Sequence, residues 1–156
     1  TYSDKGGETI GSLTQGDVVI LKYPMLGAAD FDSGIKATKI DVPAGSAPGV
    51  EQDMTIVLGG DGTQLVYDQI DFTGISTMVV SIAQFPNYFN GGTMELRLDS
   101  PNGTLLSSQE IVQGLTDVGE KKLEIDVSVE GAHDLYVNFS AEEGTVCAFI
   151  YMQFNQ

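Results

Sequence analysis

Apolar residues recur at every second position along three stretches of this chain. Residues 93–99 carry them at their second, fourth and sixth positions, with charged residues between. Residues 123–129 and 135–139 begin on an apolar residue and keep the same period. Successive side chains of a β-strand point to opposite faces of a sheet, so a period of two predicts a strand with one buried face. A helix would scatter these residues around its axis.

Seven further runs are rich in β-branched, aromatic and other apolar residues. They are residues 17–23, 36–42, 54–58, 64–72, 75–83, 104–112 and 145–154. Turn signals rich in Gly, Asn, Asp and Pro separate the runs, and no window of about eleven residues shows a helical stripe. Many short strands with Gly-rich turns favour an all-β protein, an antiparallel sandwich or barrel.

The sharpest local signal is the tripeptide Pro101-Asn102-Gly103, which stands between two of the predicted strands. An Asn-Gly pair tolerates the positive φ angles that tight hairpin turns demand. We therefore expect residues 93–112 to form a β-hairpin.

The length of 156 residues suits one domain of ordinary size. Residues 1–16 are polar and Gly-rich, which predicts a loosely ordered arm. No internal repeat and no later shift of composition divides the rest. The expected organisation is an arm over residues 1–16 and a single β module over residues 17–156.

The balance of charges excludes several kinds of partner. There are 22 acidic and 7 basic residues, so the formal charge is −15. Nucleic acids and anionic lipids are bound by clustered Lys and Arg, which this chain does not offer. The apolar runs are also far shorter than the roughly 20 residues that cross a bilayer. We expect no nucleic-acid partner and no membrane association.

Catalytic chemistry has little support in the sequence. A single Cys147 and a single His133 exclude a multi-cysteine zinc cage and most histidine-based chemistry. His133 shares the inward phase of its strand with Leu135, so we expect a core or rim histidine bonded to its neighbours. No motif marks a carboxylate pair for glycoside cleavage. The prediction is a protein without an active site.

Four segments carry a resemblance to a known family. Residues 91–106 read GGTMELRLDSPNGTLL and resemble the signature hairpin of carbohydrate-binding modules of family 6. Residues 67–72 (YDQIDF), 131–139 (GAHDLYVNF) and 151–154 (YMQF) resemble three further strands of that family, in the same order. The resemblance covers residues 50–156. It implies an antiparallel β-sandwich of the jelly-roll type that binds sugars and is usually appended to a secreted glycoside hydrolase.

The sequence departs from the family at its principal sugar site. The family has two loop aromatics and an Asn there, and the matching positions carry Gln64, Asp117 or Val118, and Ala148. Ile150 stands where the family has an acidic residue that binds a structural calcium. The resemblance therefore makes calcium conceivable for the family, but we expect no cofactor and no metal in this chain.

The order of the strands predicts where a replacement site lies. If consecutive strands from Gln64 run alternately up and down, the loops at residues 84–92, 113–119 and 141–144 lie at the same end of the sandwich as Gln64. The resemblance makes that end the family's binding apex.

The first of these loops is rich in the side chains that bind sugars. Residues 83–90 place three aromatics and two Asn in a turn region that is ordinarily polar. Flat aromatic side chains stack on pyranose rings while amides and carboxylates bond the hydroxyls. The apex candidates are Gln64, Tyr88, Phe89 and Asn90. Equally compatible with the sequence is an arrangement in which Phe85 and Phe89 cover the rim of the core and Tyr88 merely lies along the surface.

A second candidate surface is the solvent face of the predicted sheet, which some family members use. The alternation directs six polar or aromatic residues outward, namely Glu95, Arg97, Glu124, Asp126, Tyr136 and Asn138. They could bond a polyhydroxyl ligand, and they are also what any solvated sheet face presents.

We therefore expect a non-catalytic, extracellular module that targets a polysaccharide-degrading enzyme to its substrate. The partners would be a polysaccharide or oligosaccharide and a catalytic domain in the same chain. The strong negative charge favours a neutral glycan. The alternative is a degenerate sandwich that serves as a structural or protein-contact module, and an enzyme with its own active site ranks third.

Overall fold

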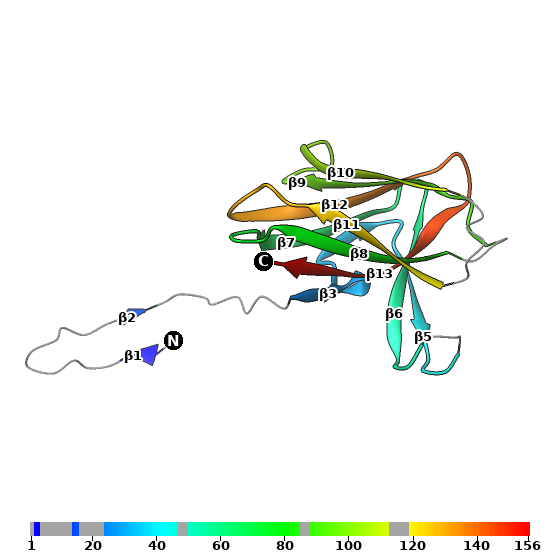
Figure 1. Cartoon of the computed structure of the whole chain (residues 1–156), viewed down its shortest axis with the longest axis horizontal. Helices are drawn as coiled ribbons and strands as arrows, with labels where there is room; N and C mark the ends of the chain where they lie inside the picture. Colours follow the sequence, from blue (N-terminus) through cyan, green and yellow to red (C-terminus); the bar gives the residue numbers. More distant parts are fainter. Residues whose placement is uncertain (1, 4–13, 16–23, 47–49, 85–87, 113–118) are drawn as a thin grey trace, which may run out of the picture.

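The strands of this protein form two antiparallel sheets that pack face to face (Figure 1). The computed structural model describes residues 2–3, 14–15, 24–46, 50–84, 88–112 and 119–156. The five-stranded sheet has the order β10-β9-β12-β7-β4. Its strands are β4 (Ser33–Ile35), β7 (Gln64–Asp71), β9 (Gly92–Leu98), β10 (Thr104–Ile111) and β12 (Ala132–Ser140).

The second sheet is six-stranded, with the order β11-β8-β13-β6-β5, and β3 also pairs with β13. Its strands are β3 (Met25–Gly27), β5 (Thr38–Val42), β6 (Met54–Gly60), β8 (Thr77–Gln84), β11 (Gly119–Asp126) and β13 (Thr145–Asn155). The short 3-10 helix η1 (Ala28–Asp30) joins β3 to the next strand. The predicted all-β antiparallel sandwich is confirmed.

The segment before residue 24 is described only at β1 (Tyr2–Ser3) and β2 (Thr14–Gln15), which pair with each other. The strand predicted over residues 17–23 lies outside the described residues. Within the part of the chain that the structure describes, no helix is long and apolar enough to span a bilayer.

The core lies between the inward faces of the two sheets. The residues that alternate in the sequence supply it: Met94, Leu96 and Leu98 on β9, and Leu135, Val137 and Phe139 on β12, are all buried. From the other sheet come Val80, Ile82, Phe149 and Met152, which are completely buried. Each large apolar side chain buried in this way contributes about 1.5–3 kcal/mol to stability. The period-two signal therefore predicted the inward face of these strands correctly.

A glycine permits a close approach between the two sheets. Gly59 on β6 faces the ring of Phe139 on β12, and a Cβ atom there would lie 2.5 Å from Phe139 Cδ1. The ring also packs against Phe149, at 6.3 Å between ring centroids. The absence of a side chain at Gly59 thus lets an aromatic ring of one sheet lie directly on the backbone of the other.

The hairpin predicted for residues 93–112 is confirmed, but its turn differs from the one expected. Strands β9 and β10 pair from Leu98 and Thr104 onward, with a bulge between Leu105 and Ser107, so the loop is residues 99–103. The positive φ, 65°, belongs to Asp99 and not to the Asn-Gly pair. Gly103 is required for another reason: a Cβ atom on it would overlap the carbonyl oxygen of Leu98. Close packing of the loop, and not a tight two-residue turn, explains this glycine.

The Gly59 contact leads to a stability prediction. Replacing Gly59 by Ala forces a methyl group against the Phe139 ring, and overpacking of this kind costs typically about 1–3 kcal/mol. Urea unfolding of the Gly59→Ala variant should show this loss. Thr38→Ala, an exposed position on the neighbouring strand β5, is the control and should change stability by less than about 0.5 kcal/mol. Equal stability of both variants would contradict the packing described here.

Candidate functional site

The loops at one end of the sandwich gather as the strand order predicts. Strand pairings place Gln64 opposite Asn138 and Gly60 opposite Thr145. A backbone hydrogen bond of 2.7 Å from Asn90 N to Thr145 O then ties the segment after β8 to the start of β13. We call this end, formed by residues 61–63, 88–91 and 141–144, the apex. Residues 85–87 and 113–118, including Phe85, Asp117 and Val118, lie outside the described residues.

The two neighbouring aromatic residues of the apex, Tyr88 and Phe89, differ in their exposure to solvent. The side chain of Tyr88 is 79% exposed, whereas that of Phe89 is only 9% exposed. Phe89 packs against Ala83 and Ala148, with Leu58 and other apolar side chains around them. These residues cover the outer face of the six-stranded sheet, which is apolar at this point. Phe89 is therefore not an exposed stacking ring, and the alternative in which it folds back over the sandwich holds for this residue.

Asn90 is held at the apex by its surroundings. Its side chain lies over Gly144, where a Cβ atom would overlap Asn90 Oδ1. Gly144 also has a φ of 72°, which favours glycine. The backbone bond to Thr145 and this close side-chain packing together fix the position of Asn90.

An open hollow of about 520 Å³ lies beside Asn90. Thr93, Ser108 and Glu110 supply polar groups to its lining, and the exposed Val112 supplies an apolar one. The lining residues of β9 and β10 were not among the sequence candidates. The predicted hairpin could have indicated them, because its register pairs Thr93 with Glu110 and so places both residues side by side.

Four sheet-face candidates do lie together on the outer face of the five-stranded sheet. Asn138 on β12 is flanked by Glu95 on β9 and by Gln64 on β7. Tyr136 is flanked in the same way by Arg97. Gln64 Nε2 donates to Asn138 Oδ1 at 3.0 Å, and Arg97 Nε donates to Glu95 Oε2 at 2.9 Å. Gln64 thus belongs to both candidate surfaces.

The hairpin loop, residues 99–103, bends back over this outer face. Asn138 Nδ2 donates to the Pro101 carbonyl at 3.0 Å, and Arg97 Nη1 donates to the Gly103 carbonyl at 2.9 Å. Asn138 stands opposite Glu95, three residues before the end of β9, so the loop must fold back to reach it. Two of the expected sugar-bonding donors are therefore already bonded to the chain itself.

The other two sheet-face candidates, Glu124 and Asp126, do not share this surface. Both are on β11, which pairs with β8 in the six-stranded sheet. They are exposed on the opposite side of the sandwich from Tyr136 and Asn138. The chain crosses between sheets after β10, and the alternation within a strand carries no information about such a crossing.

The two side chains considered for catalysis, Cys147 and His133, are held in the fold by burial or by hydrogen bonds. Cys147 is fully buried, and burial raises the pKa of its thiol to about 12, so it remains an unreactive thiol. His133 is a partly exposed rim residue bonded to Asp99 and Glu130, as the sequence predicts. Among the described residues, no group of three or more His, Cys, Asp or Glu side chains is arranged to hold a metal ion.

Comparison with known proteins agrees with this architecture. Solved carbohydrate-binding modules share this antiparallel sandwich of two sheets. Residues 27–156 match the family model "Carbohydrate binding module (family 6)". The chain belongs to this family of non-catalytic binding modules. A search of curated proteins found no match.

Solved structures with the same fold include three described by their ligands or enzymes. A β-1,3-glucan-binding family 6 module from Bacillus halodurans has a TM-score of 0.69 and 20% identity, covering 86% of this chain and 96% of that one. A family 6 module from Clostridium stercorarium in complex with cellobiose has a TM-score of 0.63 and 22% identity, covering 85% and 92%. An arabinoxylan arabinofuranohydrolase from Bacillus subtilis, in complex with cellotetraose, has a TM-score of 0.67 and 24% identity, covering 86% and 27%.

The different environments of Tyr88 and Phe89 lead to a second stability prediction. Phe89→Ala removes a buried ring and should destabilise the fold by about 3 kcal/mol, since Phe to Ala changes in packed sites cost this much. Tyr88→Ala removes an exposed ring and should change stability by less than about 0.5 kcal/mol. Thermal or urea unfolding of the two variants side by side measures both. A large loss for Tyr88→Ala would show that its ring is packed.

Proposed function

We propose that this module binds a neutral glycan at its apex, with Tyr88 as the aromatic ring on which a sugar stacks. The observation that carries the proposal is the exposure of Tyr88, whose side chain is 79% accessible, while the adjacent Phe89 is buried. A flat aromatic ring that is open to solvent is available to stack on the apolar face of a pyranose ring. A rigid neighbour such as Phe89 also orients the segment that presents the ring.

The hollow beside Asn90 supplies the polar partners that a sugar needs. Glu110 accepts hydrogen bonds, while Asn90, Thr93 and Ser108 can both donate and accept them. The exposed side chain of Val112 adds apolar surface for the C–H groups of a pyranose ring. A few polar groups around an apolar patch are the usual composition of a ligand site. The hollow opens on the outer face of the five-stranded sheet, at the end of β9 and β10 nearest the apex, so it extends the candidate site from the apex toward that face.

The charge of the chain supports a neutral ligand. At a formal charge of −15 the module repels sulfated and uronic polymers over about one Debye length, about 8 Å at physiological salt. Neutral polysaccharides experience no such repulsion. The similar structures include modules described with β-1,3-glucan and with cellobiose, which are neutral glycans.

We further propose that the module is extracellular and that it targets an enzyme carried in the same polypeptide to a polysaccharide. In the Bacillus subtilis arabinofuranohydrolase, the similar part makes up 27% of a larger enzyme chain. Binding in the same chain raises the effective concentration of substrate near a catalytic domain. The competing proposal is a structural module without sugar binding, which the replaced residues Gln64 and Ala148 support.

The binding site can be tested with a panel of neutral glycans. β-1,3-Glucan, cello-oligosaccharides and xylo-oligosaccharides are titrated calorimetrically into the parent, Tyr88→Ala and Tyr88→Phe. Loss of a stacking ring worth about 1.4 kcal/mol weakens binding about tenfold. Tyr88→Ala should show at least this loss, and Tyr88→Phe, which keeps the ring, should bind within a factor of about three.

The control for this titration is Tyr136→Ala on the outer face of the five-stranded sheet, which should bind as the parent does. Loss of affinity in Tyr136→Ala with normal binding by Tyr88→Ala would transfer the site to the sheet face. No binding of any glycan by the parent would favour the structural module.

The preference for neutral glycans has a separate test. Affinity gels that contain either a neutral β-glucan or a sulfated polymer are run at low salt and at about 0.5 M salt, where charge interactions are strongly screened. Retardation by the neutral polymer should be the same at both salt concentrations, and the sulfated polymer should cause none at low salt. Stronger retardation by the sulfated polymer at low salt would refute the preference.

A further inference from the structure

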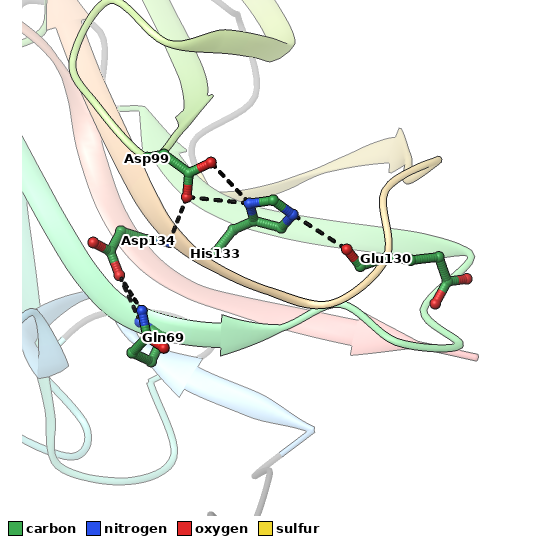
Figure 2. Close-up of polar contacts among 5 residues, drawn as sticks. All are labelled: Gln69, Asp99, Glu130, His133 and Asp134. Carbon is green, nitrogen blue, oxygen red and sulfur yellow. Dashed lines mark hydrogen bonds and ion pairs between the residues drawn. The ribbon is translucent and has the colours of Figure 1, made fainter.

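His133 lies at the end of the sandwich opposite the apex, between two hydrogen-bond acceptors (Figure 2). Its Nδ1 is 2.9 Å from Asp99 Oδ2 and 3.1 Å from Asp99 Oδ1. Its Nε2 is 3.2 Å from the carbonyl oxygen of Glu130. A neutral imidazole carries one N–H and can satisfy only one of these acceptors. The imidazolium form donates to both, so the geometry selects the charged histidine.

The acceptor Asp99 is the first residue of the loop at residues 99–103. Its backbone is fixed to β12 by a bond of 2.8 Å from Asp99 N to Asp134 O, and Asp134 N donates back to Asp99 Oδ1 at 3.3 Å. Asp99 has a φ of 65°, which is uncommon for a residue other than glycine and is kept only where the surroundings hold it. The contact with His133 is thus part of what anchors the loop.

The far side of the same loop covers the outer face of the five-stranded sheet. The carbonyls of Pro101 and Gly103 accept from Asn138 and Arg97. Opening of the loop would free these two donors. It would also expose the neighbouring side chains of Glu95 and Gln64 on the same outer face of the five-stranded sheet. The contacts at Asp99 thus hold one end of the loop whose other residues cover Asn138 and Arg97.

We propose that His133 and Asp99 form a pH-sensitive clasp that holds the loop at residues 99–103 closed over Asn138 and Arg97. The inference is independent of the glycan site at the apex, because none of these residues lines that site. Below the titration range of the histidine the clasp is charged and the loop is closed. Above it the clasp is weakened and the two donors become available to solvent or to a ligand.

The charges around His133 support this direction. The hydrogen bond to Asp99 is the main cause that raises the pKa of His133, and the bond to the Glu130 carbonyl and the charges of Asp99 and Asp134 raise it further. Asp134 remains ionised because hydrogen bonds from Gln69 lower the pKa of its carboxyl. The Glu130 carboxylate is turned away and accepts from Gly74 N at 3.2 Å. Phe72, whose ring lies 6.3 Å from the imidazole, adds no charge.

The sign of the pH dependence follows from the raised pKa. Closing the loop raises the pKa of His133 above the value of an open, solvated histidine, which is about 6.5. The stabilisation of the closed loop is therefore complete below about pH 6.5 and is lost as the pH rises through the pKa of the closed form. Each pKa unit of difference changes the closing equilibrium about tenfold.

The clasp is tested first by NMR titration of the imidazole resonances, which are unambiguous because the chain has 1 His. The parent should titrate above the ordinary histidine value. Asp99→Asn keeps an acceptor for Asp134 N but removes the charge, so the pKa of His133 should fall toward about 6.5. The control Asp126→Asn, an exposed acid on the other sheet, should leave the pKa unchanged. A parent pKa at or below the ordinary value, or no fall in Asp99→Asn, would overturn the clasp.

Closure of the loop needs a second measurement. Solvent exchange of the Asp99 and Gly103 backbone amides, relative to their intrinsic rates, is compared between the parent and His133→Gln at about pH 5 and about pH 9. Protection should be lower in His133→Gln at the lower pH, about tenfold for each unit by which the clasp raises the pKa. At the higher pH the two proteins should be alike. Equal protection at the lower pH, or a difference that persists at the higher pH, would show that the charge of His133 does not close the loop.

Discussion

Neither sheet of this protein can be stable alone, because each has one face of buried apolar side chains that only the other sheet covers. One close contact between them is made where Phe139 lies on the backbone of Gly59. Packing of this kind leaves little freedom in the middle of the sandwich, since interiors are as dense as organic crystals. The turns and loops that leave the sheets at the two ends are less constrained by this packing. Both proposed functional features are at these ends.

The apex and the clasp use the rigid sandwich in different ways. At the apex, Phe89 is buried so that Tyr88, its neighbour in sequence, is presented to solvent. At the opposite end, an irregularity in the pairing of β7 with β12 lies between His133 and Leu135, and Gln69 and Asp99 have positive φ. Departures from ideal geometry are maintained by the surrounding structure and often mark functional positions. The regular strands supply the stability on which these departures rest.

The candidate sites show which features of a site can be predicted from the alternation of residues along a strand. Alternation correctly predicted that Glu95, Arg97, Tyr136 and Asn138 point outward together. It could not predict that Glu124 and Asp126 belong to the other sheet, because the period of a strand reports which face is buried and not which sheet the strand joins. It also could not predict that Asn138 and Arg97 are bonded to loop carbonyls, since these contacts depend on how residues 99–103 fold back.

The sequence by itself predicted most of the described strands, although not the short β3 and β4, together with the hairpin of residues 93–112, the inward faces and the family. These features depend on local periodicity and on motifs that are read in order along the chain. The tertiary structure alone decided that Phe89 is buried and Tyr88 exposed, that Gly103 and not a tight turn shapes the loop, and that His133 meets Asp99. Each of these outcomes is set by atoms from distant parts of the chain. The physical reason is that burial and hydrogen bonding depend on which surfaces meet, and a linear pattern contains no record of that pairing.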